Sequence, residues 1–186
     1  RRHSFPTRRS SDLIYEQRNE IMASESVEGF IENMASNVCY SIVNNHIQPG
    51  TLREDWLVDE LIIEIQRIFA IKVQKETILA IEGDENEIAS SLYENIKMFY
   101  SKKKELYGEQ IFTSASKYIL LTTLDQVWKE HLHGLDHLKQ GIQLRAYGQK
   151  DPLIEYKREA FGLFERMLDY LKELYIQRIC HLHIDL

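Results

Sequence analysis

The chain has 186 residues, of which 44% are hydrophobic and 28% charged, and its net charge is −6. This composition is typical of a folded protein with one core of moderate size or two small ones. The longest apolar runs, 61–65 and 118–121, are far shorter than the roughly 20 residues of a membrane-spanning helix, so any membrane role must be peripheral. Two cysteines without a C-x-x-C pair favour reduced thiols.

Residues 1–13, RRHSFPTRRSSDL, differ abruptly in composition from the rest of the chain. They contain four arginines and one acid, whereas the remaining 173 residues hold 19 basic and 28 acidic side chains. A basic arm can bind anionic lipid or nucleic acid, but the patterns of a signal or transit peptide are missing. The string resembles the translation of a common sequencing adapter. We therefore expect a non-native leader, assign it no function, and do not expect nucleic acid as a partner.

The middle of the chain, 28–108, has the pattern of a small helical insertion. Helical spacing of apolar residues predicts one helix through Phe30, Met34, Val38 and Ile42, which breaks at Pro49-Gly50, and a second over 57–69. Residues 71–81 are ambiguous between helix and extended chain.

A third helix of the insertion is predicted from its start signal. Asp84 followed by Glu87 has the pattern of a capping box, and the apolar positions Ile88, Leu92, Ile96 and Phe99 continue at helical spacing. Gly108 is the expected weak point before the next helix.

Two long apolar stripes lie within 109–186. The first stripe lies on a predicted helix that we call the first arm, and its residues recur in steps of three and four: Leu121, Leu124, Trp128, His131, Leu135, Leu138 and Ile142. The second begins at Asp151-Pro152, a capping side chain before a proline, and its stripe is Phe161, Phe164, Leu168, Leu171 and Tyr175. We predict that these two stripes pack against each other as the core of a helical hairpin.

The connection between the arms, 145–151, is too short to do anything except reverse the chain, and Gly148 suits the left-handed end of a helix. The hairpin is therefore antiparallel, and its tip carries Arg145, Tyr147, Gln149 and Lys150. An ordinary surface turn, with Tyr147 covering the hairpin core, is the alternative.

Several contiguous runs resemble SecA, the ATP-driven motor of bacterial preprotein secretion. WKEHL at 128–132, LDHLKQGIQLRAYGQKDP at 135–152 and EYKREAF at 155–161 resemble its two-helix finger, and IYEQRNEIM at 14–22 resembles the end of its long scaffold helix. The resemblance implies an all-α fragment. Its parts would be the end of the scaffold helix (14–27), a helical wing (28–108), and a scaffold continuation with the finger (109–186).

The same resemblance implies what the fragment lacks. The nucleotide-binding lobes of the ATPase lie outside it, and the sequence contains no G-x-x-x-x-G-K-[ST] loop for phosphate. We therefore expect no catalytic residue, cofactor or metal in this chain, although the family binds ATP and Mg in the absent domains.

The implied partners are the SecY channel, an unfolded secretory preprotein, the absent SecA motor domains and, through the whole protein, an anionic membrane surface. The implied location is the bacterial cytoplasm and the cytoplasmic face of the inner membrane. At the tip, Tyr147 would touch an unfolded chain without reading its sequence, and Arg145 and Lys150 would hold polar or acidic groups of the channel. Exposed apolar faces on 14–22 are compatible with a homodimer. The rival hypothesis is an autonomous helical adaptor with an inert tip.

The histidines suggest metal chemistry only weakly. His133 and His137 stand four apart but lack an H-E-x-x-H pattern and fall off the apolar stripe, so a solvated face is the better interpretation and a metal hydrolase the weakest hypothesis. For His181 and His183, next to Cys180, we expect a frayed terminus. For His131 we expect a buried ring near Trp128 that is hydrogen bonded across the hairpin, with a pH switch as the alternative.

Overall fold

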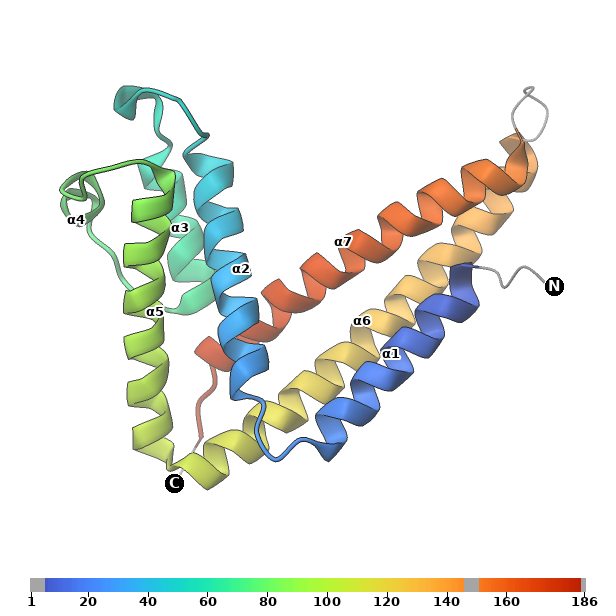
Figure 1. The fold of residues 1–186 in the computed structure, drawn as a ribbon, viewed down its shortest axis with the longest axis horizontal. Helices are drawn as coiled ribbons and strands as arrows, with labels where there is room; N and C mark the ends of the chain where they lie inside the picture. Colours follow the sequence, from blue (N-terminus) through green and yellow to red (C-terminus); the bar gives the residue numbers. More distant parts are fainter. Residues whose placement is uncertain (1–5, 146–150, 185–186) are drawn as a thin grey trace. The chain divides into compact units, whose positions relative to one another are not determined.

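The computed structural model describes residues 6–145 and 151–184, and the side chains of 10–142 and 151–184 among them. The regular secondary structure of this part of the chain is helical, without a strand (Figure 1). The predicted all-α fold is confirmed. The helices are α1 (Pro6–Ala23), α2 (Glu28–His46), the short 3-10 helix η1 (Arg53–Asp55), α3 (Val58–Phe69), α4 (Lys75–Leu79), α5 (Glu85–Tyr107), α6 (Glu109–Arg145) and α7 (Pro152–Cys180).

The chain divides into two compact units. We call Arg1–Glu25 with Leu120–Leu171 the finger unit, and Ser26–Ile119 with Lys172–Leu186 the wing unit. Helices α6 and α7 therefore contribute residues to both units. The division predicted from the sequence, into 14–27, 28–108 and 109–186, stays a prediction.

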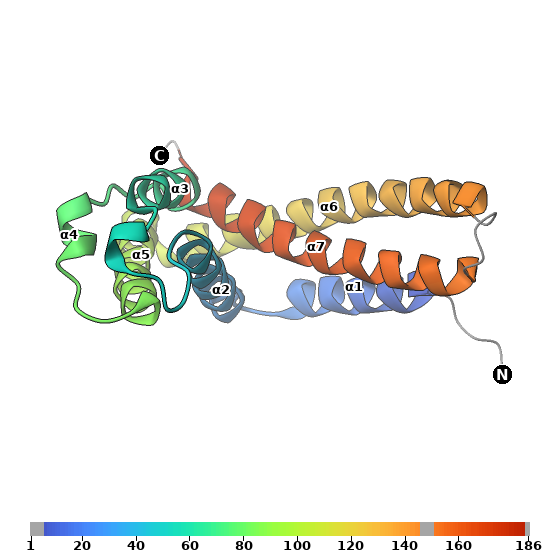
Figure 2. The same cartoon turned by 90° about the horizontal axis from the view of Figure 1, so that it is seen from above.

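In the wing unit, α2 packs against both α5 and α3, and α4 packs against α3 (Figure 2). These helices bury branched apolar side chains at helical spacing, which is why short segments can share one core. The fully buried side chains with the largest volumes in this unit are Ile47, Leu61, Ile65, Ile68, Phe69, Ile78, Ile88, Leu92, Phe112, Tyr175 and Ile176.

The helix ends of the wing unit follow the local signals in the sequence. The capping box before α5 is confirmed, with the Asn86 amide donating to Asp84 Oδ1 at 2.8 Å and the Asp84 amide donating to Glu87 Oε2 at 3.1 Å. Gly83 has φ +118° and an added Cβ would lie 2.8 Å from the Glu87 side chain, so only glycine fits here. Gly108, with φ +81°, separates α5 from α6 as predicted. The ambiguous segment 71–81 contains α4.

The finger unit consists of α1 and the long stretches of α6 and α7 within 120–171. The two arms lie side by side and run in opposite directions, as Figures 1 and 2 both show. Helix α1 begins at Pro6, inside the segment 1–13 that the sequence suggests is a non-native leader, and buries Ile14 and Ile21. That interpretation of the leader stays a prediction.

Candidate functional site

The finger arms begin and end near the predicted positions. Helix α6 ends at Arg145 and α7 starts at Pro152, where the Leu153 amide donates to Asp151 Oδ1 at 2.9 Å. Asp151 thus satisfies one of the amides that a helix leaves without an internal partner. Of the predicted tip residues, Arg145 is the last residue of α6, with its side chain outside the described part. Tyr147, Gln149 and Lys150 lie wholly outside the described residues.

The core nearest to the tip is a compact apolar cluster shared by the two arms. It contains Leu135 and Ile142 of α6 and Tyr156 and Ala160 of α7, with Leu138 and Leu163 packed at its edge. Burial of the Tyr156 hydroxyl, together with the nearby Asp136 carboxylate, raises the pKa of this tyrosine. Such a packed core gives the arms a fixed side-by-side register.

The next layer of the hairpin is aromatic. His131 is 7% exposed, and its ring centroid lies 5.2 Å from that of Trp128 and 5.8 Å from that of Phe164, the latter in an edge arrangement. Burial lowers the pKa of His131 because it disfavours the charged ring. The burial beside Trp128 agrees with the prediction. The expected hydrogen bond across the hairpin is not found among the described residues, where the ring of Phe164 meets His131 edge-on from α7.

The second arm packs through a stripe that matches the predicted one only in part. Leu171 and Tyr175 are buried as predicted, whereas other predicted positions are not. Phe161 is 62% exposed, so its assignment to the hairpin core is wrong, and Phe164 and Leu168 are only half-buried. The buried residues of α7 in the finger unit are Tyr156, Ala160, Met167 and Leu171. Both stripes have helical spacing, and hydrophobicity alone favours the one with phenylalanine. The small Ala160 side chain instead allows α6 to come close. Of the predicted α6 core, Leu124 and Leu135 are buried, Leu138 is partly buried and Trp128 is half-buried.

An ion pair that sequence reasoning missed ties α1 to the first arm. Arg18 contacts both carboxylate oxygens of Asp125, with Nε to Oδ1 at 3.0 Å and Nη2 to Oδ2 at 3.3 Å. This fork-to-fork contact raises the pKa of Arg18 and is more specific in geometry than a single hydrogen bond. The two residues are 107 positions apart, so no local pattern predicts the contact.

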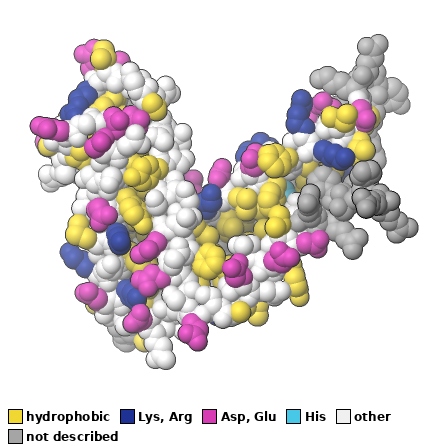
Figure 3. Space-filling model, viewed as in Figure 1, with side chains coloured by type: hydrophobic (Ala, Val, Ile, Leu, Met, Phe, Trp, Pro, Cys, Tyr) yellow, Lys and Arg dark blue, Asp and Glu magenta, His cyan; other side chains and the backbone are white. Residues whose placement is uncertain are grey.

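Exposed apolar side chains accompany charged residues along the second arm. Ile154 and Phe161 are each 62% exposed, and Arg158 pairs with Glu155 at 2.7 Å. On the face seen in Figure 3, hydrophobic side chains gather along the α6–α7 arm. An exposed apolar surface of this kind is typical of a segment that contacts another protein surface.

The histidines and helices of the described residues bear on the metal and membrane predictions. His133 and His137 are exposed, in line with the solvated-face interpretation. Within 10–142 and 151–184, no group of three or more His, Cys, Asp or Glu side chains has the arrangement of a metal site. None of the described helices is both long enough and apolar enough to cross a bilayer.

The segment after Cys180 is not frayed, contrary to expectation. The His181 Nε2 atom lies 2.9 Å from the carbonyl oxygen of Arg67, and the His183 Nδ1 atom lies 3.0 Å from the Tyr107 hydroxyl. These histidines therefore hold the tail against the wing unit. Cys180 itself is buried, and burial raises the pKa of its thiol to about 12.

Comparison with known proteins decides the family. A family model described as the SecA wing and scaffold domain matches residues 7–183. The chain belongs to the SecA family. It is 49% identical over 174 residues to the protein translocase subunit SecA of Rickettsia peacockii (strain Rustic), Rickettsia africae (strain ESF-5) and Rickettsia typhi (strain ATCC VR-144 / Wilmington). Each match covers 94% of this chain and 19% of the relative, so the chain spans about a fifth of the length of these SecA proteins.

Proposed function

We propose that this chain is the wing and scaffold portion of a SecA motor, and that its finger couples ATP-driven motion of the other SecA domains to movement of an unfolded preprotein through the SecY channel. The observation that supports this is the antiparallel hairpin itself. Its arms are fixed to each other by the Leu135–Ile142–Tyr156–Ala160 cluster and end at a short basic connection bearing Tyr147. A stiff hairpin transmits displacement from its base to its tip.

The roles of the tip residues follow from their chemistry. Tyr147 offers an aromatic ring that makes apolar contacts with any unfolded chain, and a hydroxyl that tolerates water. Arg145, Gln149 and Lys150 offer donors for carbonyl and carboxylate groups of the channel loops. In this proposal nucleotide and Mg bind to the remaining SecA domains, and this chain contributes no catalytic group. The motor works in the bacterial cytoplasm and at the cytoplasmic face of the inner membrane.

Site-specific photo-crosslinking tests the proposed partners. A photoreactive amino acid is placed at position 147 in a complete SecA in which this chain replaces the homologous segment. The proposal predicts ATP-dependent crosslinks to SecY and to a preprotein during transport. Position 170 is the matched control, since Tyr170 is an exposed tyrosine on α7 with 47% of its surface accessible. Equal crosslinking from both positions, or none from 147, would contradict the proposal.

The exposed side chains of α7 support a second candidate function, an autonomous helical adaptor that binds a partner helix through this face. Ile154 and Phe161 would then form the contact, and the tip would be inert. Self-association is the simplest form of this hypothesis. It predicts a homodimer in sedimentation experiments that Phe161→Ser converts to a monomer, and a chain that is monomeric at all concentrations would exclude that form.

A further inference from the structure

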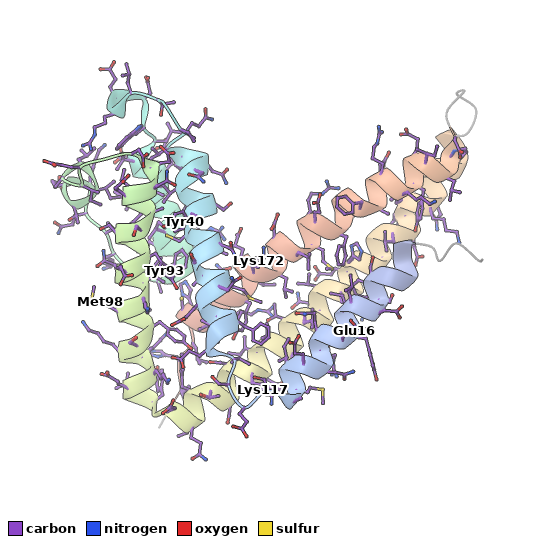
Figure 4. All side chains as sticks on the ribbon, in the orientation of Figure 1. Glu16, Tyr40, Tyr93, Met98, Lys117 and Lys172 are labelled. Atoms are coloured by element: carbon purple, nitrogen blue, oxygen red, sulfur yellow. The ribbon has the colours of Figure 1, made fainter. Side chains whose placement is uncertain are left out.

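The last part of α7 is held by side chains from two other helices of the wing unit. Residues 172–180 of α7, which begin at the Lys172 labelled in Figure 4, belong to the wing unit. Within this stretch Tyr175, Ile176, Ile179 and Cys180 are buried. In addition to the burial of these side chains, two groups of polar contacts hold this part of the helix. One comes from the end of α3 and the other from α5.

The first contact centres on Arg67, in the last turn of α3. Its guanidinium contacts Glu173 at 2.7 Å as well as Glu64 on its own helix. Its carbonyl oxygen accepts from Gln177 Nε2 at 3.4 Å and lies 2.9 Å from His181 Nε2. Three α7-side residues spaced four apart therefore meet a single residue of α3. Because they lie along one face, this contact opposes rotation of α7 about its axis.

The contact also satisfies backbone groups that would otherwise lack partners. The last four carbonyl groups of a helix have no partner within it, and the Arg67 carbonyl is one of these in α3. Side chains of α7 and its tail supply the donors. The end of α3 and the flank of α7 are consequently parts of one hydrogen-bonded arrangement.

The second contact caps α7 itself. The Lys103 ammonium group of α5 donates to the carbonyl oxygens of Cys180 and Ile179, which are among the last carbonyls of α7. A cation at this position also interacts favourably with the helix dipole. Beyond the cap, the Tyr107 hydroxyl meets His183 at 3.0 Å. These contacts oppose sliding of α7 along its axis, because a shift by one residue would move its last carbonyls away from Lys103.

We propose that Arg67, Lys103 and Tyr107 form a clamp that fixes the rotation and the axial position of residues 172–180 of α7 within the wing unit. Because α7 continues from this stretch into the finger unit, the clamp gives the wing a positioning role in transport. That role in transport rests on the proposed function, whereas the clamp itself does not.

Hydrogen exchange on this chain tests the clamp directly. Arg67→Met and Lys103→Met each keep the apolar stem of the side chain and remove the charged head. We expect either change to speed amide exchange over 173–184 by roughly threefold to tenfold, the range for the net contribution of one hydrogen bond, with α2 unchanged. Lys75→Met is the matched control, because Lys75 makes an exposed ion pair with Asp59 at 2.7 Å in the same unit. Exchange that is unchanged over 173–184, or that rises equally throughout the wing, would overturn the clamp.

Transport by a complete SecA that carries this segment tests the positioning role. The double variant Arg67→Met/Lys103→Met should translocate at least about threefold less preprotein per ATP hydrolysed, with basal ATP hydrolysis unchanged. Arg67→Lys, which retains a charge for Glu173, should recover part of the loss. Transport equal to that of Lys75→Met would overturn the positioning role. A failure of the proposed function is recognised separately, because it would appear as unchanged transport after substitution of Tyr147.

Discussion

The core of the finger can be tested by a pair of alanine substitutions for which sequence pattern and structure disagree. The apolar stripe of the sequence places both Leu135 and Phe161 in the hairpin core, whereas in the structure Leu135 is 4% exposed and Phe161 is 62% exposed. Leu135→Ala removes buried methyl groups from a packed cluster and should cost about 3 kcal/mol of unfolding free energy.

The expected cost for Phe161 is much smaller. With 62% of the residue exposed, roughly 60 Å² of ring surface leaves water on folding, which corresponds to at most about 1.5 kcal/mol. Alanine also favours the helix by about 0.5 kcal/mol over phenylalanine. Phe161→Ala should therefore cost about 1 kcal/mol or less.

Urea unfolding monitored by tryptophan fluorescence provides the measurement. The chain contains two tryptophans, and a Trp56→Phe background leaves Trp128, next to His131, as the reporter of the finger unit. Free energies of unfolding are compared between variants that have the same m value, which is the slope of this free energy against urea concentration. If Phe161→Ala costs as much as Leu135→Ala, the predicted stripe is the true core and the packing through Tyr156 and Ala160 is incorrect.

Three further predictions concern pH, capping and thiol chemistry. Burial lowers the pKa of His131, so the unfolded chain binds a proton more readily than the folded one, and the free energy of unfolding should decrease as pH falls from 7.5 through about 6.5 to 5.5. His131→Phe should flatten this pH dependence in urea titrations. An unaltered pH dependence in that variant would refute the assignment of the effect to His131. Asp84→Ala should lower the unfolding temperature of the wing unit, because it removes the side-chain oxygen that accepts from the Asn86 amide at the start of α5. Asp84→Asn, which still caps, should largely preserve that temperature, and equal loss in both variants in calorimetry would contradict capping as the cause. Burial raises the pKa of both cysteine thiols, Cys39 and Cys180, to about 12, so each should react with a thiol reagent at pH 8 only as fast as the protein opens; rapid reaction in the absence of urea would show that the thiols are accessible.

The sequence predicted the helix boundaries well where the signal is local. Asp84 with Glu87, Asp151 with Pro152, and Gly108 each set a helix end within a few residues, and the structure places helix ends there. Capping and positive φ depend on groups that are neighbours in the chain, so one sequence is enough to recognise them.

Prediction failed where the answer depends on a distant partner. Whether Ala160 or Phe161 is buried depends on the shape of the α6 surface that faces them. The spacing of apolar residues alone does not distinguish two adjacent stripes of one helix. The contacts of Arg67 with Glu173 and His181 join residues 106 and 114 positions apart, and no short pattern encodes them. The functional interpretation of the tip came from the family resemblance, which rests on long runs of residues. The local pattern of 145–151 alone indicates only an ordinary surface turn.

Preprotein transport by a tip variant tests the central claim most directly. In a complete SecA carrying this segment, Tyr147→Ala should severely reduce translocation while Tyr147→Phe, which keeps the ring, should reduce it modestly, and Tyr170→Ala should leave it unchanged. Full transport activity with Tyr147→Ala would contradict the account and favour a helical adaptor with an inert tip.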